Sequence, residues 1–126
     1  MTVHAMNHFT ILAEDLDKTC AFYRDLLGFE AGYRPDMGFP GAWLYAKDQA
    51  ILHVIAGRPL PNPRRGVLDH MAFSATNLAQ TTAKLKAQGV RYDLGRQTET
   101  GTWQLFFQDP NGAVVELDFE ASEAEA

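Results

Sequence analysis

Three histidines and one glutamate stand where the sequence otherwise reads as half-buried or buried strand. His8 and His70 each lie in a short alternating segment, while His53 and Glu116 lie inside two apolar runs. A carboxylate such as Glu116, next to Val115, is costly in an apolar strand unless it is paired or bound to a metal. Two or three imidazoles plus one carboxylate make a suitable ligand set for a divalent ion that keeps open coordination positions.

The positions of these four residues repeat along the chain. His8 maps onto His70 at an offset of 62 residues, and His53 maps onto Glu116 at an offset of 63. A period of about sixty residues indicates one supersecondary unit used twice. The repeat, more than any single residue, predicts one metal ion bound by His8, His70 and Glu116. The sequence leaves open whether His53 is a fourth ligand or only lines the pocket.

The elements that must position these residues follow the order strand, helix, strand, strand, strand in each half. In the first strand Phe9 and Ile11 share one face, and His8 lies on the other. We expect Asp15 to cap the first helix, which carries an apolar stripe, and Asn77 to cap the second. The expected strands are 6–12, 29–34, 42–46, 50–55, 69–74, 90–94, 103–108 and 113–119. The expected helices run from 15 to 27, with the stripe Leu16, Cys20, Tyr23 and Leu27 ended by Gly28, and from 77 to Gly89, carrying Leu78, Thr82 and Leu85.

Hairpin counting predicts what surrounds the site. Pairing Asp109 with Ala113 across a three-residue loop puts Phe106 opposite Glu116, with Gln104 on the same face. Pairing Ala46 with Ala50 in the same way puts Trp43 opposite His53, with Tyr45 nearby. The predicted pocket wall is Trp43, Tyr45, Gln104 and Phe106. A turn of different length would move every one of these side chains to the other face of the sheet. In that alternative the aromatic residues belong to the core and not to a pocket.

Composition limits the function. The 126 residues fit one domain, expected as a first module at about 4–57, a linker at 58–66, a second module at about 67–120 and a frayed acidic tail at 121–126. A net charge of −5 without a basic run argues against nucleic acid and anionic membranes as partners. A single cysteine, Cys20, fits a reducing cytoplasm, where we expect the chain, and we expect no signal peptide because residues 1–5 lack a charged and an apolar region.

Three stretches together resemble the vicinal oxygen chelate superfamily of glyoxalase I, extradiol dioxygenases, fosfomycin-resistance transferases and bleomycin-resistance proteins. They are HFTILAEDLDKTCAFYRDLLGF, LDHMAFSATNL and FFQDPNGAVVELDF, and the likeness covers roughly residues 6 to 119. The resemblance implies an α+β fold in which two tandem βαβββ modules form a curved, partly open mixed β-barrel with flanking helices. It implies ligand slots at His8, His70 and Glu116, with His53 in the fourth slot, and a homodimer.

The resemblance also implies a reaction. We expect a metal-dependent glyoxalase-like lyase or isomerase that acts on a small vicinally oxygenated molecule through an enediolate, with Glu116 or His53 as the base. Each site would hold one divalent ion, for which Zn, Ni, Co, Mn and Fe(II) are all acceptable. The alternatives are a metal-free drug-binding protein of the bleomycin-resistance type and an Fe(II) extradiol dioxygenase.

Departures from the family pattern narrow this choice. Phe106 stands where ring-cleaving relatives usually carry a tyrosine, and nothing after Glu116 is lysine or arginine, which argues against an anionic phosphonate substrate. Glutathione would need cationic groups. The available arginines are Arg34, Arg58, Arg64 and Arg65, and no pattern aims them at the site.

Overall fold

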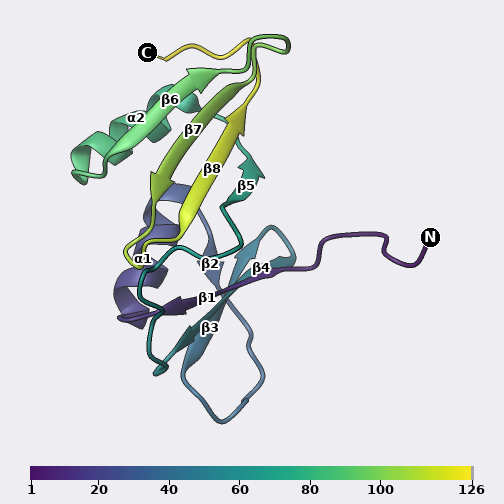
Figure 1. The fold of residues 1–126 in the computed structure, drawn as a ribbon, viewed down its shortest axis with the longest axis vertical. Helices are drawn as coiled ribbons and strands as arrows, with labels where there is room; N and C mark the ends of the chain where they lie inside the picture. The colour runs from purple at the N-terminus through teal and green to yellow at the C-terminus, as the bar shows by residue number, and fades with distance from the viewer. Residues whose placement is uncertain (126) are drawn as a thin grey trace. The chain divides into compact units, whose positions relative to one another are not determined.

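The computed structural model describes residues 1–125 and divides the chain into two compact units. The first unit is Met1–Pro61, and the second begins at Asn62. Each unit is one βαβββ module with a four-stranded mixed sheet and one helix (Figure 1). The predicted α+β architecture and its doubled module are therefore confirmed, and neither sheet closes on itself.

The first unit holds β1 (Phe9–Ala13), α1 (Leu16–Leu27), β2 (Glu30–Ala31), β3 (Gly41–Ala46) and β4 (Gln49–Ala56). Its strand order is β1-β4-β3-β2, with β1 parallel to β4 and the other neighbours antiparallel. The parallel pair is possible because α1 provides the crossover between β1 and the hairpin.

Helix α1 covers one face of this sheet and contacts β2, β3 and β4. Its ends are as predicted: Asp15 accepts a hydrogen bond from the Lys18 amide at 3.0 Å, and Gly28 ends the helix at φ 77°. The predicted stripe is only partly right. Tyr23 is buried, but the other buried residues of the helix are Thr19, Phe22 and Leu26. The strands β3 and β4, which α1 contacts, contribute the fully buried Leu44, Leu52 and Val54.

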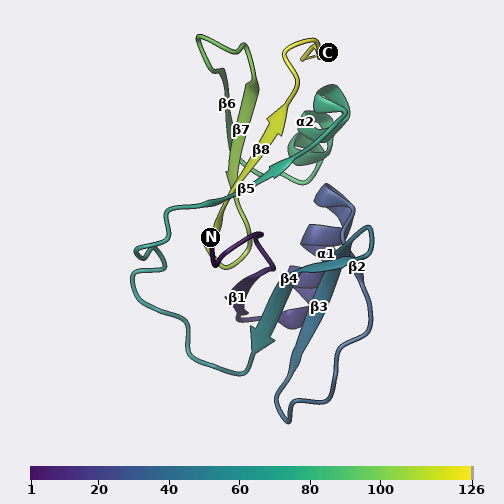
Figure 2. The same cartoon turned by 90° about the vertical axis from the view of Figure 1, so that its right-hand side faces the viewer.

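The second unit repeats the same topology. It contains β5 (Met71–Ser74), α2 (Leu78–Ala87), β6 (Tyr92–Arg96), β7 (Trp103–Gln108) and β8 (Val114–Phe119), in the sheet order β5-β8-β7-β6. Helix α2 lies against one face of this sheet in both views (Figures 1 and 2). The predicted helix residues Leu78, Thr82 and Leu85 are all buried.

The start of α2 differs from the prediction. Asn77 adopts a left-handed conformation and makes no side-chain cap bond. Instead the carboxylate of Glu123 accepts hydrogen bonds from the amides of Leu78 at 2.7 Å and Asn77 at 3.2 Å. The Trp103 indole also donates to the Glu123 carbonyl at 2.8 Å, and Arg96 donates to the Ala121 carbonyl. The expectation of a frayed tail is therefore wrong for residues 121–123.

Within residues 1–125, neither helix has the length and apolar character needed to cross a membrane.

Candidate functional site

The two units present their candidate residues at equivalent positions. His8 immediately precedes β1 and His70 immediately precedes β5. In the parallel pairs, Thr10 lies beside His53 as Ala72 lies beside Glu116. The slot that holds a histidine in the first unit therefore holds a glutamate in the second, as the repeat predicted.

In the second unit, His70 and Glu116 point their polar atoms at each other. Nε2 of His70 lies 3.0 Å from Oε1 of Glu116, and Glu116 is only 6% exposed. The other carboxylate oxygen, Oε2, accepts a hydrogen bond of 3.4 Å from the Gln104 amide. The buried Glu116 carboxylate therefore contacts two side chains: His70, which immediately precedes β5, and Gln104 of β7.

A neighbouring carboxylate fixes the orientation of the His70 ring. Nδ1 of His70 lies 2.7 Å from Oδ2 of Asp69, and Asp69 also accepts a bond of 2.9 Å from Arg65. These partners lower the pKa of Asp69, whereas the Asp69 hydrogen bond, followed by the charge of Glu116, raises the pKa of His70. Since an ionised carboxylate can only accept, Nδ1 carries a hydrogen and Nε2 is the atom turned toward Glu116.

His8 is held in the same way by its own predecessor. Nδ1 of His8 lies 2.7 Å from Oδ1 of Asn7, which is equivalent in the repeat to Asp69. An amide oxygen can only accept, so Nε2 of His8 carries the free lone pair in the neutral ring. The two histidines that precede β1 and β5 therefore share one tautomer.

A third acidic side chain, Asp118, was not predicted as part of the site. It lies two residues after Glu116 on the same face of β8, opposite Gln104. Burial, and then the neighbouring Glu116, raise the pKa of Asp118 to about 6. Its Oδ1 is buried without a hydrogen-bond partner among residues 1–125. The signal for Asp118 was its alternation with Glu116 in the last strand.

In the first unit, His53 is one layer of a stack of three rings. The His8 and His53 rings lie 3.7 Å apart between centroids and 10° from parallel. Trp43 stacks on His53 at 4.2 Å and 14°. Nε2 of His53 lies 3.1 Å from the Ala50 carbonyl. Burial is the main cause that lowers the pKa of His53, followed by the charge of His8.

Both register predictions for the pocket wall are confirmed. Phe106 lies opposite Glu116, and Trp43 lies opposite His53. The predicted turn of the first hairpin is wrong, because Ala46 pairs with Gln49 rather than with Ala50. A register shift between Leu44 and Ala46 restores the predicted pairing further along the hairpin.

The four predicted wall residues have different surroundings. Phe106 contacts the His70 ring edge-to-face at 5.7 Å, and Gln104 binds Glu116. The Tyr45 hydroxyl donates a hydrogen bond to the Tyr33 carbonyl at 2.7 Å.

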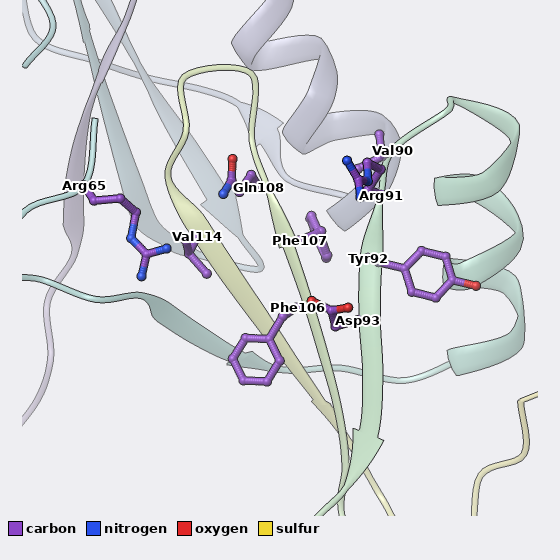
Figure 3. Close-up of a pocket in the computed structure, with 9 residues that line it drawn as sticks. All are labelled: Arg65, Val90, Arg91, Tyr92, Asp93, Phe106, Phe107, Gln108 and Val114. Atoms are coloured by element: carbon purple, nitrogen blue, oxygen red, sulfur yellow. The ribbon is translucent and has the colours of Figure 1, made fainter. Parts of the chain in front are cut away.

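A cavity of about 580 Å³ opens beside Phe106 in the second unit (Figure 3). The pairing of β6 with β7 places Asp93 opposite Phe106, on the same face of the sheet. The Tyr92 ring points away from that face, toward α2 (Figure 3). Arg65, one of the arginines that the sequence could not place, also lines this cavity. The remaining lining residues are Val90, Arg91, Phe107, Gln108 and Val114.

The structure brings His8 together with His53, and His70 together with Glu116, each pair within its own unit. Within residues 1–125 there is no group of three or more His, Cys, Asp or Glu side chains arranged to hold a metal ion. The convergence of His8, His70 and Glu116 on one ion stays a prediction.

Comparison with known proteins identifies the family. Residues 5–117 match the model of the Glyoxalase/Bleomycin resistance protein/Dioxygenase superfamily. The chain is 30% identical over 120 residues to Glyoxylase I 4 of Arabidopsis thaliana, covering 90% of this chain and 69% of that protein. It is 28% identical to the biphenyl-2,3-diol 1,2-dioxygenase of Paraburkholderia xenovorans, covering 92% of this chain and 41% of the dioxygenase.

A solved structure shares the fold. A mutant of the fosfomycin resistance protein FosX from Listeria monocytogenes, complexed with Mn(II) and 1S,2S-dihydroxypropylphosphonic acid, superposes with a TM-score of 0.77. The identity is 19%, and the match covers 94% of each chain. With the family model matching almost its whole length, this chain belongs to the Glyoxalase/Bleomycin resistance protein/Dioxygenase superfamily.

Proposed function

We propose that the chain is a metal-dependent lyase or isomerase of the glyoxalase type, acting on a small molecule with oxygens on adjacent carbons. The observation that carries the proposal is the His70–Glu116 pair, in which a buried carboxylate and an imidazole nitrogen lie 3.0 Å apart. The likeness to Glyoxylase I 4 supports the reaction class. The FosX complex, which contains both Mn(II) and a vicinal diol, supports the kind of ligand.

The donor set fits a divalent ion. The bond between Nδ1 of His70 and Asp69 is the arrangement that orients a metal-binding histidine and raises its basicity. Nε2 of His70 and Oε1 of Glu116 then face each other across a distance at which a proton or a cation can bind both. Metal binding to such a pair displaces the proton, so the affinity rises with pH.

His8, His70 and Glu116 would hold the ion. A divalent ion supplies Lewis-acid polarisation of the substrate carbonyl. Glu116 acts as the base that removes the proton from the neighbouring carbon and returns it, with His53 as the second candidate. Gln104, through its amide, holds Oε2 of Glu116 in place during this transfer. Phe106 forms an apolar wall that excludes water from the same face.

The test is proton exchange in deuterium oxide with a panel of small hydroxy ketones, hydroxy aldehydes and their thiol adducts. Metal-loaded wild-type protein is expected to exchange the proton beside the carbonyl of at least one compound, followed by NMR. Chelator treatment and Glu116→Gln are each expected to abolish this exchange. Glu120→Gln, an exposed glutamate just beyond β8, is the matched control. Full activity in Glu116→Gln would refute the mechanism.

A second candidate is an Fe(II) extradiol dioxygenase, which the likeness to the biphenyl-diol dioxygenase favours. Phe106 argues against a dioxygenase, because the side chain opposite Glu116 has no hydroxyl to assist a catechol. Anaerobic reconstitution with Fe(II), followed by oxygen and a catechol panel, distinguishes the two reactions. Formation of ring-cleaved, coloured products would refute the isomerase proposal and support the dioxygenase.

A further inference from the structure

The two units hold their paired side chains in different geometries, although the positions are equivalent in the repeat. In the second unit the polar atoms of His70 and Glu116 converge to 3.0 Å. In the first unit the rings of His8 and His53 lie face to face, with centroids 3.7 Å apart. The first arrangement lets both side chains bind one ion, and the second does not.

The reason is the direction of the imidazole lone pair. A metal-binding imidazole holds the ion in the plane of its ring, with a metal–nitrogen distance of about 2.0 Å. An ion placed between two rings stacked at 3.7 Å would lie about 1.8 Å out of each plane, nearly above the nitrogen rather than in line with its lone pair. Because the rings are only 10° from parallel, their planes do not meet within reach of the nitrogens.

The tautomers of the two histidines also argue against one ion bound by both rings. His8 directs Nδ1 to Asn7 and leaves Nε2, its outer nitrogen, with the lone pair. His53 does the reverse: Nε2 donates to the Ala50 carbonyl, and only Nδ1, next to its own backbone, keeps a lone pair. His53 is also enclosed on its other face by Trp43 at 4.2 Å.

We infer that His53 is not a metal ligand but a positioning residue, whose ring is clamped between Trp43 and His8 and holds the His8 imidazole in its binding orientation. This inference rests on the proposed function, since it concerns the same metal. The ligand set is then two imidazoles and one carboxylate.

The test compares two replacements of His53 in the full chain. His53→Phe keeps a flat ring in the stack but removes both nitrogens, whereas His53→Ala removes the ring. Affinity for Co²⁺ alone is measured by competition with a chromogenic chelator. His53→Phe is expected to change the dissociation constant less than about threefold, and His53→Ala to raise it about tenfold, as for a lost orienting contact. His8→Phe, which removes a ligand, is expected to raise it more than about a hundredfold, and His4→Phe, at an exposed position, to leave it unchanged.

A second readout counts the ligands directly. Pulsed EPR of the Cu²⁺-loaded protein is expected to show two coordinated imidazoles in wild type and in His53→Phe. Three imidazoles in wild type, or loss of Co²⁺ binding in His53→Phe comparable to His8→Phe, would overturn the inference while leaving the metal enzyme intact. A wild-type chain that takes up no divalent ion would overturn the proposed function and the ligand assignment together. In metal-free protein, absent nuclear Overhauser contacts between the His8 and His53 rings would overturn the clamp alone.

Discussion

Replacing Asp118 by asparagine should stabilise the metal-free protein at neutral pH. Asp118 lies two residues from Glu116 on the same face of β8, and its Oδ1 is buried without a hydrogen-bond partner among the described residues. The contacts described above give neither carboxyl group an arginine or lysine partner. Asparagine keeps the shape of the side chain and removes one of the two like charges.

The size and pH window of the effect follow from the pKa. Burial and Glu116 raise the pKa of Asp118 from 3.8 to about 6. For a fully buried group this shift would correspond to about 3 kcal/mol, and solvent screening at this half-buried position reduces the expected gain to about 1 kcal/mol. A raised carboxyl pKa gives stability that is fully present below about pH 4 and is lost as the pH rises through about 6. The difference between Asp118→Asn and wild type should therefore be near zero at about pH 4 and reach its full size above about pH 6.

The assay is urea unfolding of chelator-treated protein at a series of pH values. Each unit contains one tryptophan, so a Trp43→Phe background makes Trp103 fluorescence report on the second unit alone. Glu120→Gln removes an exposed charge nearby and serves as the control, for which less than about 0.5 kcal/mol is expected. A variant that is destabilised at pH 7, or a gain that is the same at every pH, would refute the reasoning about the carboxylate pair.

The remaining predictions concern the stability of the second unit: the cap of α2, the core and the β7–β8 turn. Glu123→Ala should lower the free energy of unfolding by about 1 kcal/mol through loss of the helix cap, whereas Glu125→Ala should not change it in the same urea titration. Leu85→Ala should cost about 2–5 kcal/mol because this side chain is fully buried, with exposed Lys84→Ala as the comparison; a loss below about 1 kcal/mol would contradict the described core. Asp109→Ala should cost about 1–3 kcal/mol, because its Oδ1 accepts two backbone amides in the β7–β8 turn, and faster amide exchange confined to that turn would confirm the cause.

Features with a local sequence signal were predictable. The turn that starts at Asp109 has a strong signature, and its Oδ1 bonds and the left-handed Gly112 set the register that places Phe106 opposite Glu116. The first hairpin carries a weaker signal. Its turn uses Lys47 at φ 56° and closes one residue earlier than predicted, and only a bulge brings Trp43 back opposite His53.

Features that depend on distant contacts were not predictable. The cap of α2 comes from Glu123, 45 residues after Leu78, and no local pattern links the two. Asn77 looked like the cap because its residue type is favoured there. The same holds inside the site: the repeat placed His53 and Glu116 in one slot, but the ring stack of the first unit depends on side-chain rotamers that a sequence does not show.

The most direct test of the central claim is elemental analysis of protein purified without chelator and then equilibrated with a mixture of divalent ions. Wild-type protein is expected to bind about one ion per chain, His70→Ala and Glu116→Ala less than about a tenth of that, and His4→Ala the full amount. Wild-type protein without a bound divalent ion, or undiminished metal in Glu116→Ala, would contradict the central claim.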